Sequence, residues 1–207
     1  MRIQIIDLKV NNTKSLVNSL ASIPDTEIKV CESVEECKSS NLTILPGIGK
    51  FGAVSNIMLN KGFDEYLKQT FTNGDKILGI CLGMQLLGSK SDESPGSSGL
   101  GIIPGVSKRL PSGFGQRIPN TGWASVIKSD RSIDFKSFLD EKDFYFVHSY
   151  FFDAEFTENI SNYSFFGEFM FPSVIYNQNV LGVQFHPEKS SAIGKKLLNE
   201  IRDWANE

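Results

Sequence analysis

The chain has 207 residues, enough for one α/β domain with a substantial core and few for two. Its 21 basic and 24 acidic residues are interspersed and leave a net charge of −3, so no basic stripe suggests a nucleic-acid partner. No apolar run approaches the length that spans a membrane, and strand-like residues rather than a signal peptide follow the N-terminus, so we expect a cytoplasmic protein without a membrane partner.

The first half of the chain alternates short apolar runs with helical patterns, which is typical of a parallel sheet. The expected elements are strands over residues 3–6, 28–30, 42–45 and 76–80, and a helix over residues 13–22. Ser33 and Glu36 have the spacing of a capping box, which predicts a further short helix. Two more helical segments follow residue 49, with stops at Gly62 and Gly74.

The second half lacks long helices until its end. Strand-like runs occupy residues 123–127, 144–147, 174–176 and 180–185, and a helix over residues 195–204 closes the chain. Runs without helices between them indicate hairpins, so we expect a mixed sheet. With no repeat and no clear boundary, the sequence predicts one α/β domain over residues 1–207. Its central sheet is mostly parallel and flanked by helices, with an added antiparallel part.

Cysteine and histidine are scarce, and this narrows the chemistry. Cys31, Cys37 and Cys81 are odd in number and lack Cys-x-x-Cys spacing, which disfavours disulfide scaffolds and zinc sites and fits a reducing cytosol. We expect neither a metal nor another cofactor. His148 and His186 are the only histidines, so a base paired with a thiol must be one of these two.

The strand predicted over residues 76–80 runs directly into a helical pattern through a Gly-x-Cys-x-Gly turn centred on Cys81. Gly79 and Gly83 suit a sharp strand-to-helix turn, in which a Cβ atom would clash with neighbouring backbone. The turn puts Cys81 at a helix N-terminus, where the helix dipole favours thiolate over thiol. A lone cysteine is usually a small buried hydrophobe. The flanking glycines and the distant His186 favour a nucleophile instead.

His186, Pro187 and Glu188 follow the strand predicted over residues 180–185. Proline stops the strand, and a glutamate two residues after a histidine can accept the imidazole N–H and fix its tautomer. An isolated His-x-Glu is more often a surface pair. Together with the cysteine turn, it predicts a Cys81–His186–Glu188 catalytic triad.

These motifs resemble the triad-type, class I glutamine amidotransferases. The segments that carry the resemblance are Pro46-Gly47-Ile48-Gly49, Gly79-Ile80-Cys81-Leu82-Gly83-Met84-Gln85, Glu93, Val147-His148-Ser149-Tyr150 and Gln184-Phe185-His186-Pro187-Glu188-Lys189-Ser190. Within the family, residues 46–52 and 147–150 most resemble the glutaminase subunits of imidazole glycerol phosphate synthase. The resemblance covers essentially the whole chain and implies the class I glutamine amidotransferase fold.

The resemblance implies that Cys81 attacks the side-chain amide of L-glutamine and that ammonia and glutamate form through a γ-glutamyl thioester. Ammonia would pass to a synthase or cyclase subunit of (βα)8-barrel type that forms imidazole glycerol phosphate in histidine biosynthesis. The oxyanion donors would be Leu82 N–H and an N–H from Ile48 or Gly49. The residues expected to bind glutamine are Gln85, Glu93, Ser149 and Tyr150. The residues expected at the partner interface are Lys9, Asn12, Asn120 and Trp123.

Two of these assignments have ordinary alternatives. Glu93, taken by itself, is typical of a solvated loop charge, although a carboxylate suits the α-ammonium group of glutamine. Trp123 suits either an interface anchor or an ordinary core position. His148 fits a positioned or structural histidine better than the base, because no carboxylate follows it until Asp153.

Two segments depart from the family pattern. Where the family resembles Tyr-Gly-x-Gly-Asn, residues 8–12 match only at Asn12, and where it resembles Pro-His-x-Gly-Trp-Asn, this chain has Asn120 and Ala124. Two explanations of these departures stay open. One is drift in surface loops, and the other is a paralogue that serves a related synthase, such as one that amidates a surface-polysaccharide sugar.

Two other classes of function stay open at this point. A non-catalytic regulatory subunit is disfavoured by the intact Cys81, His186 and Glu188. A cysteine peptidase is disfavoured because the Pro-Gly-x-Gly loop and Glu93 suit a small amino acid better than a peptide.

Overall fold

The computed structural model describes residues 1–10, 13–113, 116–129 and 138–207, and its main feature is a large mixed sheet. Across the described part of this sheet the strand order is β2 (Glu27–Cys31), β1 (Arg2–Ile6), β3 (Leu42–Gly47), β4 (Lys76–Cys81), β12 (Val180–Val183), β11 (Phe169–Asn177), β10 (Ile160–Phe166), β7 (Asn120–Lys128) and β8 (Lys142–His148). The strands from β2 to β12 pair in parallel, and those from β12 to β8 pair antiparallel. The predicted combination of a parallel centre and an antiparallel part is therefore confirmed.

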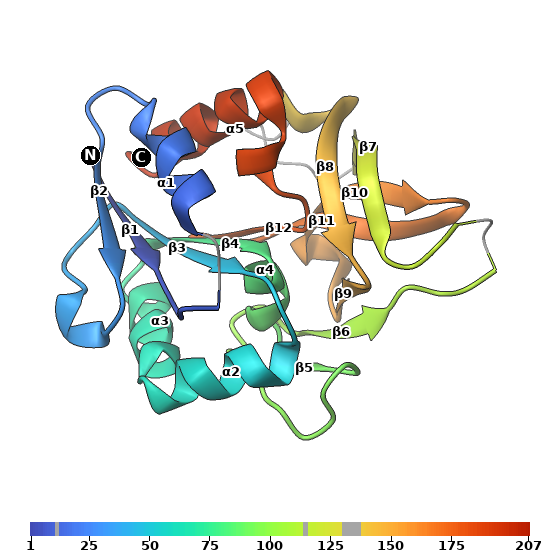
Figure 1. Cartoon of the computed structure of the whole chain (residues 1–207), viewed down its shortest axis with the longest axis horizontal. Helices are drawn as coiled ribbons and strands as arrows, with labels where there is room; N and C mark the ends of the chain where they lie inside the picture. The colour runs from blue at the N-terminus through green and yellow to red at the C-terminus, as the bar shows by residue number, and fades with distance from the viewer. Residues whose placement is uncertain (11–12, 114–115, 130–137) are drawn as a thin grey trace.

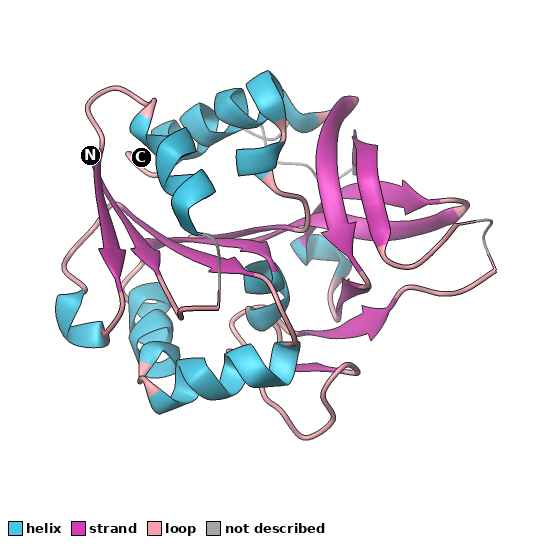
Figure 2. Ribbon diagram, viewed as in Figure 1, coloured by secondary structure: helices cyan, strands magenta, loops and turns pink. Residues whose placement is uncertain are grey.

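Helices cover both faces of the parallel part (Figures 1 and 2). One face carries α1 (Thr13–Ala21) and α5 (Ser191–Trp204), and the other carries α2 (Phe51–Asn60), α3 (Phe63–Thr72) and the short α4 (Leu82–Leu86). Buried side chains of α1 and α5 join one apolar cluster with the sheet, and those of α2 and α3 join a second. None of the helices in the described ranges is long and apolar enough to cross a membrane.

A second, smaller sheet contains β5 (Lys90–Ser91), β6 (Gly105–Arg109) and β9 (Tyr150–Ala154). The sequence analysis predicted none of these strands, nor β10. In β10 the polar side chains of Ser161, Asn162 and Ser164 are buried beside apolar ones, so the strand shows neither clean alternation nor a continuous apolar run.

The capping box predicted at Ser33 is wrong. Residues Val34–Glu36 form a single 3₁₀ turn, and the Ser33 side chain makes no capping hydrogen bond. The Glu36 carboxylate accepts a hydrogen bond from Glu32 N at 2.8 Å instead of from the cap residue. A single turn has too few unpaired N–H groups to be stabilised by the two reciprocal hydrogen bonds of a capping box.

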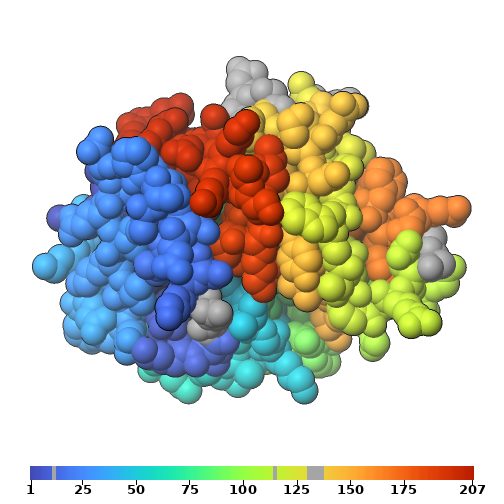
Figure 3. Space-filling model, turned by 45° about the horizontal axis from the view of Figure 1, so that its top comes forward, coloured from blue at the N-terminus to red at the C-terminus, as the bar shows by residue number. Residues whose placement is uncertain are grey.

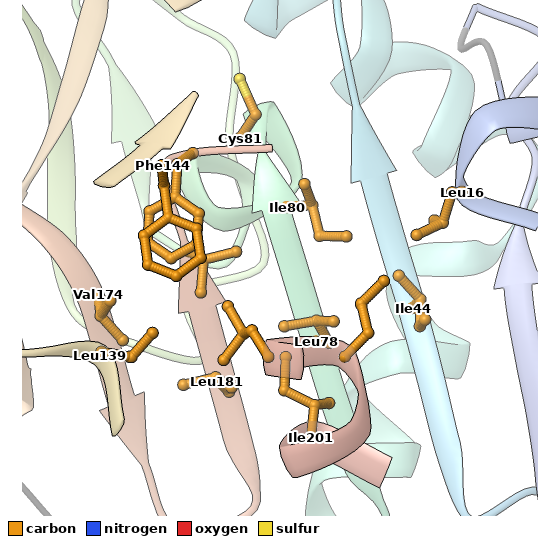
Figure 4. Close-up of a cluster of buried hydrophobic side chains, with 14 of the residues drawn as sticks. Leu16, Ile44, Leu78, Ile80, Cys81, Leu139, Phe144, Val174, Leu181 and Ile201 are labelled. Atoms are coloured by element: carbon orange, nitrogen blue, oxygen red, sulfur yellow. The ribbon is translucent and has the colours of Figure 1, made fainter. Parts of the chain in front are cut away.

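Cys81 ends β4 near the middle of the sheet, at the edge of the apolar cluster to which it belongs, and its sulfur points away from the other labelled side chains (Figure 4). Its two neighbouring strands are parallel, so their carboxyl ends lie on either side of it. Gly47 at the end of β3 is in register with Cys81, and Val183 at the end of β12 is in register with Ile80. The residues after β3 and β12 therefore flank the thiol, as expected for functional residues in parallel sheets.

The turn from β4 into α4 has the strained backbone of a nucleophile elbow. Cys81 has φ of 54° and ψ of −111°, a region that side-chain-bearing residues rarely adopt. A Cβ atom on Gly83 would lie 1.8 Å from the Leu45 carbonyl oxygen, and one on Gly79 would lie 2.8 Å from the Gly83 oxygen. The expectation that both glycines permit a close backbone approach is confirmed.

We predict that Gly83→Ala destabilises the protein by about 3 kcal/mol, because the added methyl group must push two backbone segments apart. Gly96→Ala is the matched control. Gly96 has φ of 89° and open space around its Cβ position, so only its left-handed backbone opposes alanine, at about 1 kcal/mol. Urea unfolding of both variants measures this, and equal losses would contradict the close-approach argument.

Candidate active site

The loop after β12 brings His186 and Glu188 together and holds both in place. His186 Nδ1 and Glu188 Oε1 lie 2.7 Å apart, and both side chains are almost fully buried. His186 N donates to Tyr145 O at 2.9 Å, and Ser190 Oγ donates to His186 O at 2.6 Å. Figure 3 shows the C-terminal segment, in red, on the surface between the N-terminal part in blue and the strands in yellow. Because both side chains are buried, the His-x-Glu pair is an internal pair, not the surface pair that the motif more often represents.

The charge environment of His186 favours an imidazolium next to a thiolate. Burial acts to lower the pKa of His186, but the Cys81 sulfur and the Glu188 carboxylate outweigh it and raise the pKa to about 10. Glu188 uses Nδ1, so the interaction with Cys81 falls to Nε2. Within the described ranges, Nε2 is buried and makes no hydrogen bond of good geometry, so it remains available to the thiol. His186 is thus arranged to take the thiol proton.

A pocket of about 370 Å³ opens beside the sulfur, within the size range of small-molecule sites. Its lining residues are Ile48, Gly49, Cys81, Leu82, Gln85, Glu93, Pro119, Val147, His148, Ser149, Tyr150 and Lys189. The structure thus brings together around one cavity the predicted nucleophile, the predicted oxyanion residues and the residues predicted to bind glutamine. His186 and Glu188 line a smaller neighbouring cavity that shares Ile48 and Lys189.

Two of these residues have contacts that limit what they can offer a ligand. Gln85 Nε2 donates to Tyr150 O at 2.9 Å and to Gln184 Oε1 at 3.1 Å, so both of its amide hydrogens are engaged. Its Oε1 is the side-chain atom that can accept a hydrogen bond from a ligand in the pocket. Glu93 Oε2 accepts from Phe51 N, the first residue of α2, at 2.7 Å. Glu93 is half-buried and held by this contact, so the ordinary alternative of a solvated loop charge is wrong.

His148 is buried and neutral, which fits the expectation that it is not the base. Its Nδ1 lies 2.9 Å from Tyr150 O, and its Nε2 lies 3.0 Å from Asn120 Nδ2. A carbonyl oxygen can only accept, so Nδ1 carries the proton and Nε2 accepts from the Asn120 amide. Burial and, to a smaller extent, the nearby His186 outweigh the bond to Tyr150 O and together lower the pKa of His148 to about 4.

Of the residues predicted at a partner interface, Lys9, Asn120 and Trp123 are described, and none of these three lines the pocket. Trp123 is 53% exposed on β7, with an edge contact to Tyr145, so a core position for Trp123 is excluded. Lys9 is exposed after β1 and pairs with Glu32 and Asp7. The Asn120 amide faces His148 inside the protein. Asn12 lies outside the described residues.

Sequence reasoning missed two residues at the site, Gln184 and Lys189. Gln184 Nε2 lies 3.7 Å from Cys81 Sγ, and Lys189 lines both cavities. Both occur in the motif around His186, but only the fold shows which side chains of that motif meet the thiol. Among the described residues, no group of three or more His, Cys, Asp or Glu side chains could hold a metal ion.

A family model and curated relatives match this chain along nearly its whole length. Residues 4–202 match the family model "Glutamine amidotransferase class-I". The chain is 38% identical to "Imidazole glycerol phosphate synthase subunit HisH" of Desulfitobacterium hafniense, an alignment covering 99% of this chain and 95% of the relative. It is 34% identical to the protein of the same name in Streptococcus sanguinis, covering 98% and 96%.

Solved structures agree on the fold. A crystal structure of a glutamine amidotransferase superposes with a TM-score of 0.74 at 17% identity and covers 99% of both chains. The structure of PurLQS from Thermotoga maritima gives 0.74 at 17% identity and covers 98% of both chains. At this identity the likeness supports the fold alone.

We predict that His148 makes stability fall in mild acid. The imidazole binds a proton near pH 6.5 when unfolded and only near pH 4 when folded, so the unfolded state takes up more protons in this window. Stability should therefore drop by about 3 kcal/mol between pH 6.5 and 4 because of this group. Urea unfolding at both pH values should reveal a loss that shrinks by this amount in His148→Gln, which cannot titrate. His186 is common to both proteins, so an equal loss in the two would contradict the prediction.

Proposed function

Because the chain belongs to the class-I glutamine amidotransferase family, we propose that it is the glutaminase subunit of an imidazole glycerol phosphate synthase. It hydrolyses L-glutamine and passes the ammonia to a partner synthase. The observation that carries the proposal is the meeting of the Cys81 elbow with the His186–Glu188 pair, beside a pocket suited to one amino acid. The whole described chain serves as one glutaminase domain.

The reaction begins from the pair in which His186 already holds the proton of the Cys81 thiol. The thiolate attacks the side-chain carbonyl carbon of glutamine, and the carbonyl π electrons move to oxygen. When this tetrahedral intermediate collapses, His186 Nε2 gives its proton to the amide nitrogen, which leaves as ammonia. Glu188 holds Nδ1 at 2.7 Å throughout and offsets the imidazolium charge.

A γ-glutamyl thioester on Cys81 remains, and water hydrolyses it with His186 acting first as a base. His186 takes a proton from the water, hydroxide adds to the thioester carbonyl, and the thiolate leaves to release glutamate. Both steps pass through an oxyanion. The Leu82 N–H, at the first position of α4, is one donor, and an N–H of Ile48 or Gly49 across the pocket is the second.

The amino-acid end of glutamine contacts other residues that line the pocket. The Gln85 Oε1 acceptor and the Glu93 carboxylate suit the α-ammonium group, and Ser149 and Tyr150 complete the lining. Glu93 is fixed by the N-terminus of α2, which supports a constant position for the carboxylate.

The partner is a cyclase of (βα)8-barrel type, docked at the carboxyl end of the sheet. Lys9, Asn12 and the exposed Trp123 form the contact surface, and Trp123 is the anchor because large aromatics dominate interface energy once buried. The loop with Ile48, itself 41% exposed, is the candidate switch that keeps hydrolysis slow until docking. The free thiols fit a cytosolic location.

The relatives' names favour histidine biosynthesis over the alternatives. A paralogue serving a polysaccharide synthase and a non-catalytic subunit are not favoured, since the two relatives compared above are both named as subunits of imidazole glycerol phosphate synthase.

We predict that a diazo-ketone analogue of glutamine labels Cys81 alone. Burial raises the pKa of Cys31, and it raises that of Cys37 to about 12, so these two thiols are internal controls. Peptide mapping identifies the labelled residue, and label on Cys31 or Cys37 instead of Cys81 would refute the assignment.

We predict that Cys81→Ala and His186→Ala each lower glutaminase activity by about ten-thousand-fold or more. The double variant should be little worse than either single one, because triad members act as a unit. Steady-state assays with the partner present measure this. Losses that multiply in the double variant would mean that the two residues act independently.

We predict that this gene, co-expressed with the cyclase of its own organism, restores growth without histidine to a strain lacking its glutaminase subunit. The same gene with Cys81→Ala should fail, because no ammonia reaches the cyclase. Failure of the unaltered gene, with intact glutamine hydrolysis beside another cognate synthase, would favour the paralogue instead.

A further inference from the structure

Gln184 is a buried amide that the mechanism above does not use, and it touches the nucleophile. Its side chain is fully buried just beyond the end of β12, between Cys81 and Gln85. Its Nε2 lies 3.7 Å from Cys81 Sγ, a hydrogen-bond distance for sulfur, and its Oε1 lies 3.1 Å from Gln85 Nε2. Burying an amide is costly unless its groups are paired, and here one of the partners is the reacting sulfur.

The direction of the hydrogen bond to sulfur follows from the Tyr150 carbonyl oxygen, which accepts a hydrogen bond at the other end of the network. The Tyr150 carbonyl can only accept, so Gln85 must present Nε2 to it, at 2.9 Å. The second hydrogen of that Nε2 points to Gln184, which must therefore present Oε1. The Nε2 of Gln184 is left facing Cys81, so the amide donates to sulfur and does not compete with it as an acceptor.

The Tyr150 carbonyl oxygen also accepts a second hydrogen bond, from His148. His148 Nδ1 donates to the same Tyr150 oxygen at 2.9 Å, and Asn120 Nδ2 donates to His148 Nε2 at 3.0 Å. Both ring nitrogens of His148 are therefore satisfied. The whole network has one consistent set of donors and acceptors, which makes a flip of the Gln184 amide costly.

We propose that Gln184 is a positioning residue that donates a hydrogen bond to the Cys81 thiolate, with its orientation set by Gln85 and the Tyr150 carbonyl. The proposal deepens the proposed function and rests on Cys81 as its nucleophile. A donor to sulfur stabilises the thiolate relative to the thiol and holds Sγ in one rotamer toward the pocket. Of the groups that react, Gln184 contacts the sulfur, and it takes no proton.

Other groups also act on Cys81, and the test must separate Gln184 from them. His186 and Glu188 face it from the loop after β12, His148 from β8, Lys189 from the 3₁₀ turn Pro187–Lys189, and Glu93 from the loop after β5. None of these changes when Gln184 alone is replaced. A shift produced by that replacement therefore reports the amide.

The experiment follows alkylation of Cys81 by iodoacetamide against pH, with the product located by peptide mapping. The reagent is small and neutral, so the rate tracks the thiolate fraction without needing glutamine or a partner. Gln184→Met removes the donor at similar length, and Gln184→Glu keeps the shape but replaces the donor with a carboxylate. We expect the midpoint of the profile to rise by about one pH unit in Gln184→Met and further in Gln184→Glu.

Gln4→Glu is the matched control. Gln4 is also buried, lies on β1 of the same sheet, and its amide contacts a different sulfur, Cys31, at 3.8 Å. The change imposes the same buried carboxylate away from the pocket, so it should lower stability without moving the Cys81 profile. If Gln184→Glu fails to fold, the neutral Gln184→Met still decides. In glutaminase assays Gln184→Met should lower kcat several-fold while KM stays close to that of the wild type.

The outcomes separate this proposal from the function it rests on. A low wild-type midpoint that rises in the Gln184 variants but not in Gln4→Glu supports the proposal. A low wild-type midpoint that the Gln184 variants leave unchanged overturns the role of Gln184 and leaves Cys81 as the nucleophile. A wild-type midpoint at the ordinary thiol value of about 8.5 overturns the activated nucleophile together with Gln184.

Discussion

The close backbone contact between the end of β3 and the turn after β4 is the constraint on which the site depends. A Cβ atom on Gly47 would lie 2.5 Å from Gly83 N, and one on Gly83 would meet the Leu45 oxygen at 1.8 Å. Only glycine at both positions lets the two segments touch. That contact sets the Ile48 loop across from Leu82, so the nucleophile and both candidate oxyanion donors share one pocket.

Burial gives the site its electrostatic character. His186 and Glu188 are almost fully buried, which makes their hydrogen bond strong and an unpaired charge costly. An imidazolium there is stable only with Glu188 on one side and a thiolate on the other, which is why the pKa of His186 is raised to about 10 in spite of burial. The same dry surroundings keep His148 neutral, and its pKa is lowered to about 4. The two histidines of the chain thus differ in charge near neutral pH, His186 being cationic and His148 neutral.

The antiparallel part of the sheet completes the pocket wall. Asn120 at the start of β7 pairs with His148 at the end of β8 in both backbone register and side-chain hydrogen bonding. Asn120 is one of the positions where the chain departs from the family pattern. This departure therefore lies on a strand and contacts His148 inside the protein. Trp123, three residues further along the same strand, points outward.

The sequence by itself determined what local chemistry controls. Glycines spaced around Cys81 predict the elbow, apolar periodicity predicts α1 and α5, and a glutamate two residues from His186 predicts their hydrogen bond, because each depends on neighbours in the chain. The pairing of strands that lie far apart in the sequence could not be predicted in this way. Strand β10 was missed because it buries polar side chains, which disguises its pattern.

The tertiary structure alone decided which polar groups meet across the site. Gln85 and Gln184 stand 99 positions apart, and their contact exists only because β12 lies beside β4 in the sheet. Glu93 reaches the pocket because it binds the N-terminus of α2, and Asn120 reaches His148 because β7 pairs with β8. A hydrogen bond needs its two atoms within about 3 Å, and strand order, which no local pattern specifies, brings such distant atoms together.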